Sequence, residues 1–459
     1  MNEMSQELSE FVTNSAEKLG VPGAAVGVLA GGREIFACHG VTSADNPLPV
    51  DRDTMFVVGS VSKTFTATAL MQLVAEGQVE LDAPVRRYVP EFTVPDAAAA
   101  DGITVSRLLN HTAGLEWRLS DDPGEGDDAL ARHAAKLAES RLIAEPGARA
   151  SYSQAGFNLA GRIVENVTGL TFERAVASLL FEPLGLAHSC YAVNDVMTRR
   201  FAVGHNIDVN GAVAVARQWK DNRANNPGGG VASSAGDLLR WARFHLGDGR
   251  AAGGDRILPA ELLHRMREQT VELRGSTLGD GLGICWFLRE VDGVATIGHG
   301  GSANGQFADL LIVPERNFAV VVMSNAGPDA GLAFNRATVN WVLERVLSMV
   351  ERDPEPLPYD GARAREIVGQ YENEMMRLTL DTDGTGLTIE CAIKPEIRTA
   401  TDTELPPDLP PAAFGLLPGD ADGYIVTGGG LQGQRGFFTR DESGAVAGID
   451  LAGRLFARV

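Results

Sequence analysis

The sequence predicts a mixed α/β domain, with an antiparallel sheet and a helical region, followed by a small all-β domain. Strand-like segments at 23–29 and 34–40 precede a long helical region, and strands return at about 283–324 before a helix at 332–349. A proline-rich segment, 351–364, then separates a run of short alternating segments from the rest. With 459 residues, the chain is long enough for one large and one small domain.

The most informative part of the large domain is a predicted helix that contains Ser60 and Lys63. Residues three apart on a helix are neighbours, so Lys63 Nζ can reach Ser60 Oγ. Residues 64–74 are almost all apolar or small, and Gly77 supplies a C-terminal stop. Burial disfavours the charged form of a lysine, and a neutral lysine can take a proton from a serine. The pair therefore predicts a catalytic nucleophile and its base.

The Ser-x-x-Lys spacing alone is weak evidence. Ser15 and Lys18 have the same spacing on a polar N-terminal helix, where we interpret it as chance. The chain has only five lysines, so a lysine among apolar helix residues is less easily explained by chance. The alternative is a half-buried lysine that extends to the surface, and the rest of the chain has to decide between the two.

Further motifs follow in order along the chain, and several ordered motifs are more specific than any one of them. They are Val21-Pro-Gly-Ala24, Phe56 to Thr66, Leu108-Leu-Asn-His-Thr-Ala-Gly-Leu115, Tyr152 to Gly161, Pro183-Leu-Gly-Leu186, Gly228 to Asp237, Gly281 to Trp286 and His299-Gly-Gly-Ser302. Residues 21–349 thereby resemble the serine β-lactamase and penicillin-binding-protein superfamily, on its class C β-lactamase, D-aminopeptidase and esterase side. The resemblance implies a β-lactamase/transpeptidase-like fold and acyl-enzyme chemistry with no metal or organic cofactor.

The second family motif, Tyr-x-Asn, falls on Tyr152-Ser-Gln154. By resemblance, Tyr152 relays a proton between Ser60, Lys63 and the leaving group, and a cationic lysine nearby is expected to lower its pKa. An aromatic packing residue is the alternative. Gln154 replaces the usual Asn and is expected to orient the acyl side of the substrate, with its amide one methylene further out.

The third motif falls on His299-Gly300-Gly301, where the lactamases have Lys-Thr-Gly. The resemblance implies that the N–H of Ser302 pairs with that of Ser60 as an oxyanion hole, and the glycines allow close approach of a substrate. His299 makes a penicillin-destroying enzyme less expected. We expect it to meet a substrate carboxylate as a cation, with a neutral donor or a shape element as the alternatives.

The C-terminal region has a different pattern of residues. Its alternating segments predict a small antiparallel barrel that resembles the lipocalin-like domain of some family hydrolases. We predict a hydrolase domain at 1–350, a linker at 351–364 and the barrel at 365–459. A proline-marked inserted loop is a candidate cover for the cleft; its prolines are Pro406, Pro407, Pro410 and Pro411.

Composition restricts the partners. A net charge of −20 argues against nucleic acid and anionic membranes as partners but says nothing specific about the substrate. The resemblance implies a small-molecule or peptide substrate. The N-terminus is acidic and lacks an apolar signal segment, so we expect a cytoplasmic location. The four cysteines are widely separated and show no metal-ligand spacing.

Three functions remain open. The first is a serine acyl-enzyme hydrolase of peptide-like amides or esters. The second is an acyl transferase, such as a penicillin-binding-protein-type thioesterase or peptide cyclase, whose substrate would be a thioester or carrier-protein-bound peptide. The third is a sensor that is acylated but does not turn over. Intact Ser60, Lys63 and Tyr152 argue against the sensor, because a pure binder needs no proton relay.

Overall fold

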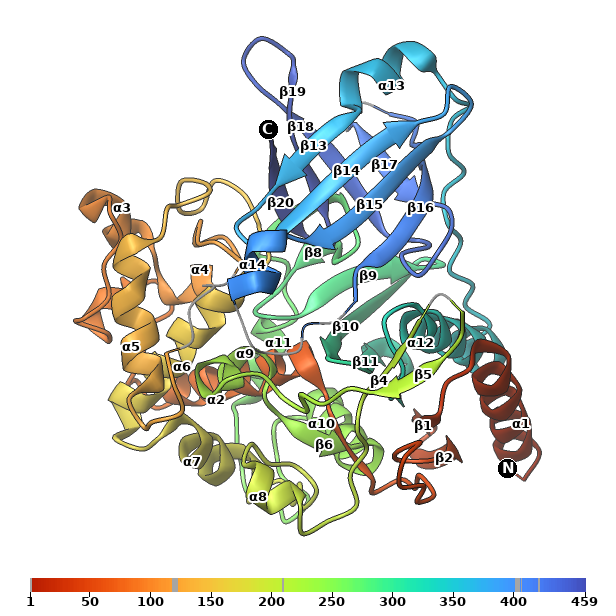
Figure 1. Ribbon diagram of the computed structural model, residues 1–459. Coiled ribbons are helices and arrows are strands. Elements are labelled where there is room, and N and C mark those ends of the chain that lie inside the picture. Colours follow the sequence, from red (N-terminus) through yellow and green to blue (C-terminus); the bar gives the residue numbers. More distant parts are fainter. Residues whose placement is uncertain (1, 118–122, 209, 401–404, 406, 420–421) are drawn as a thin grey trace.

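The computed structural model shows a mixed α/β body that carries a closed β-barrel (Figure 1). It describes residues 2–117, 123–208, 210–400, 405, 407–419 and 422–459. Figure 1 places the barrel above the main sheet, most helices to one side, and the N-terminal helix on the other side. The predicted fold class, a mixed α/β domain plus a small all-β barrel, is confirmed.

The centre of the body is an eight-stranded sheet in which every neighbouring pair is antiparallel. The central strand β12 is buried on both faces, because Val320 and Val322 face one core while Val321 and Met323 face the other. In spatial order the strands are β2 (Arg33–Gly40), β1 (Gly23–Ala30), β12 (Phe318–Ser324), β11 (Gln306–Val313), β10 (Val294–Ala303), β9 (Phe287–Val291), β8 (Gly279–Leu282) and β7 (Val271–Ser276).

Helices cover both faces of this sheet. On one face, α1 (Asn2–Leu19) and α12 (Asp329–Val342) share an apolar core with the strands. On the other face lies the larger core, to which α2 (Ser62–Ala75), α6 (Gln154–Thr168) and α10 (Ala235–Leu246) contribute. The shorter elements are α3 (Ala97–Gly102), α4 (Val105–Leu109), α5 (Ala129–Lys136), α7 (Phe172–Val176), α8 (Val193–Val196), α9 (Asn226–Gly229), α11 (Ala260–Arg265), and the pairs β3 (Met55–Val57) with β6 (Ala232–Ser234) and β4 (His205–Ile207) with β5 (Val213–Val215).

The C-terminal region forms an eight-stranded barrel in which each strand pairs with the next and the last returns to the first. Aromatic residues, among them Tyr371, Tyr424 and Phe456, fill its interior together with aliphatic side chains. Residues 348–360 before it contain no helix or strand, and the domain boundaries stay a prediction. The elements are α13 (Gly361–Ile367), β13 (Gly369–Glu372), β14 (Met376–Thr382), β15 (Leu387–Ile393), α14 (Pro395–Ala400), β16 (Leu409–Leu416), β17 (Gly423–Val426), β18 (Arg435–Arg440), β19 (Val446–Leu451) and β20 (Arg454–Arg458).

The barrel reaches the body through the tight turn between β19 and β20. Ala452 and Gly453 form this turn with φ of 52° and 73°, which is the geometry of a two-residue hairpin turn. The N–H of Tyr152 donates to Gly453 O at 2.7 Å. The tip of the barrel therefore lies against one of the predicted catalytic residues.

This contact differs from the expected cover. Pro410 and Pro411 lie inside strand β16, and Pro406 lies outside the described residues. An edge position or a bulge allows proline in a strand, and β16 has a register shift against β15. The hairpin at 451–454 is the part of the described barrel that contacts Tyr152.

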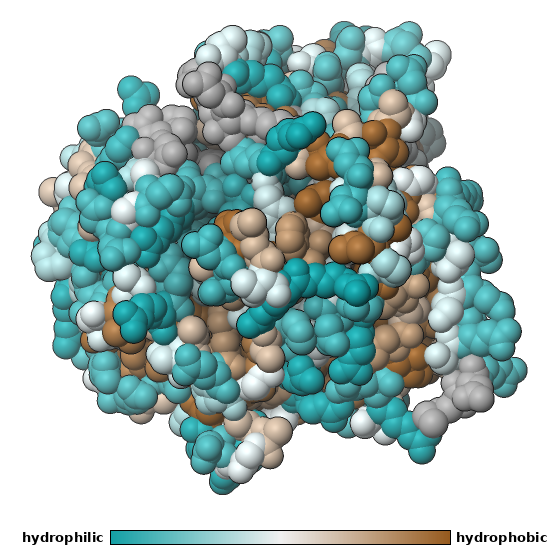
Figure 2. Space-filling model, turned by 60° about the horizontal axis from the view of Figure 1, so that its bottom comes forward, coloured by the Kyte–Doolittle hydropathy of each residue, from teal (hydrophilic) through white to brown (hydrophobic). Residues whose placement is uncertain are grey.

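Figure 2 shows one face of the molecule, on which hydrophilic residues dominate and hydrophobic residues gather mainly near the centre and towards one side. In the described part of the chain, no helix combines the length and apolar character needed to cross a membrane.

Replacing Gly453 by alanine tests the hairpin contact. A Cβ at this position would lie 2.1 Å from Leu278 Cδ1, on a backbone with positive φ. We expect Gly453→Ala to lose roughly 1 kcal/mol from backbone strain and also to slow active-site labelling, because Leu278 and the hairpin must move. Thermal melting and fluorophosphonate labelling kinetics measure the two effects.

The matched control is Gly444→Ala, which also has positive φ (86°) but meets nothing within 4 Å. We expect it to lose stability without a change in labelling. Equal labelling rates for the two variants would contradict a role for the hairpin at the site.

Candidate active site

Ser60 lies in a single tight turn, Gly59–Val61, that leads directly into α2. The segment before the turn is tied to a neighbouring loop, because Val58 N–H donates to Val231 O at 2.9 Å. Gly59 has φ of 51°, and a Cβ there would lie 2.4 Å from the backbone nitrogen of Ser302. Only glycine allows this turn to lie so close to β10.

Lys63 is completely buried and its amine has three neighbours. Nζ lies 3.3 Å from Ser60 Oγ, 2.6 Å from Gln154 Oε1 and 2.7 Å from Gly228 O. A neutral amine has two N–H donors and one lone pair. The two carbonyl oxygens accept the two donors, which leaves the lone pair for the hydroxyl proton of Ser60.

Burial holds the pKa of Lys63 well below its usual value of 10.5, and the positive charge of Arg454 acts in the same direction. No carboxylate is among the causes that act on it. The lowered pKa favours the neutral form of Lys63, and its role as the base stays a prediction.

Gln154 holds Lys63 rather than facing the cleft. Its Oε1 accepts from Lys63, and its Nε2 donates to Asn158 Oδ1 at 2.9 Å. Asn158 is one helical turn further along α6 and fixes which end of the amide points at the lysine. Both ends of the amide are thus used inside the protein, whereas the sequence assigned Gln154 to the acyl side of the substrate.

Tyr152 precedes the N-cap of α6, which is Ser153. Its ring lies 4.4 Å from the His111 ring, and Lys63 Nζ lies 4.8 Å from its centroid. Burial raises the pKa of the Tyr152 phenol, while Arg454 and a hydrogen bond with the Ser60 side chain partly oppose this rise. The expected fall in the Tyr152 pKa was wrong, because desolvation outweighs the nearby positive charge of Arg454.

His299 is buried at the wall of the cleft and stacks on Phe287 with ring centroids 4.3 Å apart. Its Nδ1 lies 2.6 Å from Gly300 O, which makes Nδ1 the protonated nitrogen of the neutral ring. Burial lowers the pKa of His299 to about 3. The low pKa goes against a cationic histidine and fits the neutral alternative, and the role of His299 toward a substrate stays a prediction.

Gly301 lets β10 lie against the turn that carries Ser60. A Cβ at Gly301 would be 2.7 Å from Ser60 N and 2.0 Å from Val58 O. Strand β9 pairs with β10 only from Val294 to Gly298, so residues 299–303 continue past the end of β9 as an edge beside Ser60. The assignment of the Ser302 and Ser60 N–H groups to the oxyanion stays a prediction.

These residues share one cleft with the barrel. A cavity of about 380 Å³ is lined by Ser60, Tyr152 and residues 298–302, and also by Ala452 and Arg454. The Arg454 guanidinium lies 4.8 Å from the Tyr152 ring centroid and 4.6 Å from that of Trp117. The barrel therefore adds a positive charge to the wall of the cleft.

The model of the Beta-lactamase family matches residues 8–343. The chain belongs to the beta-lactamase family. Among its relatives, penicillin-binding protein 4 of Amycolatopsis lactamdurans is 34% identical over 360 residues, which cover 77% of this chain and 94% of that protein. This membership places the chain in a superfamily of serine hydrolases and transpeptidases.

Solved structures extend the likeness to the whole chain. The crystal structure of SurE aligns over 100% of both chains with a TM-score of 0.76 and 25% identity. The class C β-lactamase from Rhodobacter sphaeroides covers 73% of this chain and 97% of its own, with a TM-score of 0.60 and 26% identity. The β-lactamase fold is thus shared with both, and the likeness to SurE includes the barrel.

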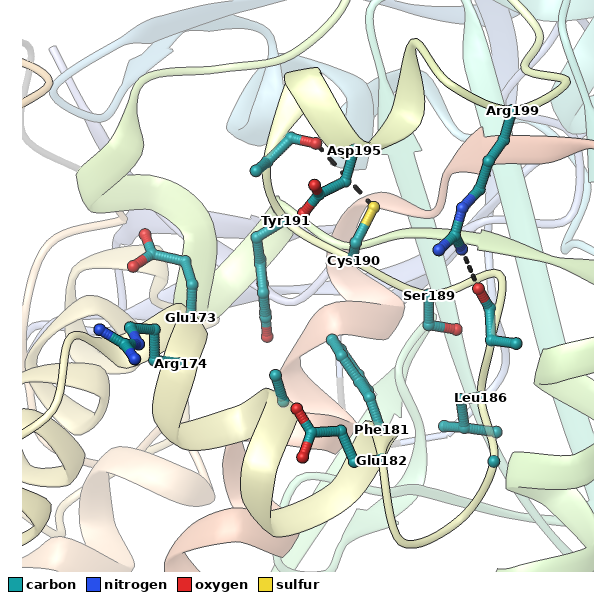
Figure 3. Close-up of a pocket in the computed structure, with 14 residues that line it drawn as sticks. Glu173, Arg174, Phe181, Glu182, Leu186, Ser189, Cys190, Tyr191, Asp195 and Arg199 are labelled. Carbon is teal, nitrogen blue, oxygen red and sulfur yellow. Dashed lines mark hydrogen bonds between the residues drawn. The ribbon is translucent and has the colours of Figure 1, made fainter.

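A second cavity, of about 610 Å³, lies in the helical region near α7 and α8. Figure 3 shows Tyr191, Phe181, Glu173 and Cys190 around it. It contains none of the residues of the Ser60 cleft, so size alone does not identify the site. Among the described residues, no group of three or more His, Cys, Asp or Glu side chains is placed to hold a metal ion.

Sequence reasoning missed three contributors to the site. Asn158 could have been found from its spacing of four residues after Gln154 on a predicted helix. Gly228 acts through its carbonyl oxygen, which carries no side-chain signal. Arg454 follows a recognisable hairpin turn, but nothing in the sequence says which surface that turn touches.

We expect Ser60 to be the covalent site. After fluorophosphonate labelling, peptide mapping should place the adduct on Ser60, and Lys63→Ala should lower labelling almost as far as Ser60→Ala because the pair acts as a unit. Ser62, whose Oγ accepts from Val231 N–H at 3.0 Å, gives the matched control Ser62→Ala. An adduct on another serine would overturn the assignment.

The pH dependence of acylation should show an acid limb from Lys63. Activity should be lost as pH falls through the pKa of Lys63, because protonation removes the base. Since burial holds this pKa well below 10.5, full activity should already be reached well below pH 10.5. Lys63→Arg should be inactive throughout, since arginine does not deprotonate in proteins. Stopped-flow labelling with a neutral ester measures this.

His299 should not contribute to the same profile. Since the pKa of His299 is about 3, it stays neutral over the working range. Substrates that end in a carboxylate and their neutral esters should therefore share one pH profile, and an additional limb near pH 6 for acid-ended substrates alone would restore the cationic histidine.

Proposed function

We propose that this protein is a serine acyl-enzyme hydrolase of peptide-like amides or esters. The observation that carries the proposal is the Lys63 amine, buried and held by two carbonyl oxygens with its lone pair left for Ser60. A lysine held for packing alone has no need of this arrangement.

The proposed reaction begins when Ser60 Oγ attacks the carbonyl carbon while its proton passes to Lys63 Nζ. The developing oxyanion accepts from the N–H groups of Ser60 and Ser302, and each such donor contributes a few kcal/mol. Tyr152 then gives its phenolic proton to the leaving group and takes one back from Lys63. The cycle ends when water attacks the ester by the reverse path.

The exposed edge of β10 at 299–303 supports a peptide-like substrate. An extended chain can pair with an unpaired strand edge through main-chain hydrogen bonds. Gly300 and Gly301 have no side chains, so a substrate backbone can approach this edge closely.

Acyl transfer is the second candidate, and the barrel is the observation that favours it. The hairpin at 451–454 contacts Tyr152 and lines the cleft, so it restricts the space open to water. The end-to-end likeness to SurE shows that the barrel belongs to a recurring architecture. In this version an amine resolves the acyl-enzyme, and the donor is a thioester or carrier-bound peptide.

The ratio of products tests the two candidates. Wild-type protein is incubated with D- and L-amino acid p-nitroanilides and peptidyl thioesters, with and without an added amine, and intact mass and chromatography follow the acyl-enzyme and products. We expect acylation and turnover that Ser60→Ala abolishes. Mainly hydrolysed product with the amine present supports the hydrolase, and mainly aminolysed or cyclised product supports acyl transfer. An acyl-enzyme that never turns over would contradict both functions and support a sensor.

A further inference from the structure

The Ser60 cleft continues past the edge of β10 to the opposite face of that strand. Side chains alternate across a strand, so Gly301 faces Ser60 whereas Gly300 faces the side of α12. The same cavity that contains Ser60 is also lined by Asp309, by α12 residues and by the barrel loop at 430–434. The mechanism above uses none of these groups.

Asp309 is the charged group nearest to the edge on this side. It lies opposite Gly300 in the β10–β11 register, and its Oδ1 is 3.0 Å from where a Cβ on Gly300 would be. A glycine at 300 therefore leaves the carboxylate uncovered toward the strand edge. The other oxygen, Oδ2, accepts from Asn335 Nδ2 at 2.9 Å.

Asp309 has no cationic partner among the described residues, and Asn335 is its one side-chain donor there. The other charged groups of this part of the cavity are paired. Arg289 contacts Glu351, and Arg336 contacts Asp353, each at 2.5 Å. The unpaired charge in this part of the cleft is therefore negative.

The environment of Asp309 raises the free energy of its charged form. Burial raises the pKa of Asp309 to about 6, so it is still mostly ionised at neutral pH. A carboxylate in a partly closed cavity that has one hydrogen bond and no counter-ion is stabilised most by a positively charged hydrogen-bond donor. A second acceptor, Gln434 Oε1, also lies in the wall of this cavity without a partner among the described residues. An ammonium group has three donors and suits such acceptors.

The site is within reach of the reaction centre. The path from Ser60 N through the Cα atoms of Gly301 and Gly300 to Asp309 Oδ1 is at most about 13 Å, since consecutive Cα atoms are about 3.8 Å apart. An extended substrate advances about 3.3 Å per residue, and a lysine side chain adds about 6 Å of reach beyond its Cα. A group one or two residues from the scissile bond therefore reaches Asp309.

We propose that Asp309 receives a primary ammonium group of the substrate, carried one or two residues from the scissile bond. This inference rests on the proposed acyl-enzyme function and names a chemical preference for it. Asp309 would act as a specificity residue that takes no part in the bond-making steps.

The test compares Asp309→Asn with wild type on paired peptide thioesters that carry lysine or norleucine at the first or second position on either side of the scissile bond. Asparagine keeps an oxygen for Asn335 and removes only the charge. We expect wild type to prefer lysine at one of these positions by about tenfold in kcat/KM, the size of one charge-assisted hydrogen bond, and the variant to lose that preference with norleucine unchanged.

The control is Asp353→Asn, a carboxylate that is paired with Arg336 near the same cavity. It should keep the preference. Loss of the lysine preference in Asp309→Asn, with the preference kept in Asp353→Asn, identifies Asp309 as the group that receives the substrate ammonium. No ammonium preference in wild type, or an equal preference in Asp309→Asn, would overturn the proposal. Fluorophosphonate labelling of Ser60 is measured alongside, so that failure of the acyl-enzyme chemistry is recognised separately.

Discussion

The burial of one amine determines how the rest of the site must be built. A charged lysine enclosed this completely, with no carboxylate beside it, would cost several kcal/mol. Burial therefore favours the neutral form of Lys63, whose two N–H donors can both be accepted by carbonyl oxygens. Gln154 and Gly228 offer carbonyl oxygens rather than negative charge. A carboxylate in place of Gln154 would raise the pKa of the lysine and remove the base.

That enclosure depends on backbone segments that approach one another closely. Gly59 and Gly301 bring the turn of Ser60 against β10, and a Cβ at Gly228 would lie 1.5 Å from Gln154 Nε2. Each of these glycines occupies a place where a side chain would separate two elements. Catalytic geometry and core packing are thus the same constraint here, because the groups that exclude water from Lys63 also position it.

The sequence predicted what depends on local spacing or on ordered motifs. Ser60 and Lys63 are three residues apart, so their contact follows from helical geometry alone, and the mixed sheet with its barrel followed from periodicity and resemblance. The charge states of the site residues were harder to predict from the sequence. The neutral state of His299 comes from Phe287 and from burial, and the raised pKa of Tyr152 comes from its enclosure. The contact between Tyr152 and Gly453 joins residues about three hundred positions apart, which no local pattern encodes.

Two parts of the barrel line the cavity that runs along the edge of β10. The hairpin with Arg454 lies beside Tyr152 on the face of Ser60, while the loop at 430–434 lines the cavity on the face of Asp309. One side of the cleft thus carries an added positive charge and the other an unpaired negative one. Since the proposed catalytic groups Ser60, Lys63 and Tyr152 all come from the larger body, we expect changes in the barrel to alter which molecules are accepted while leaving the proposed proton relay in place.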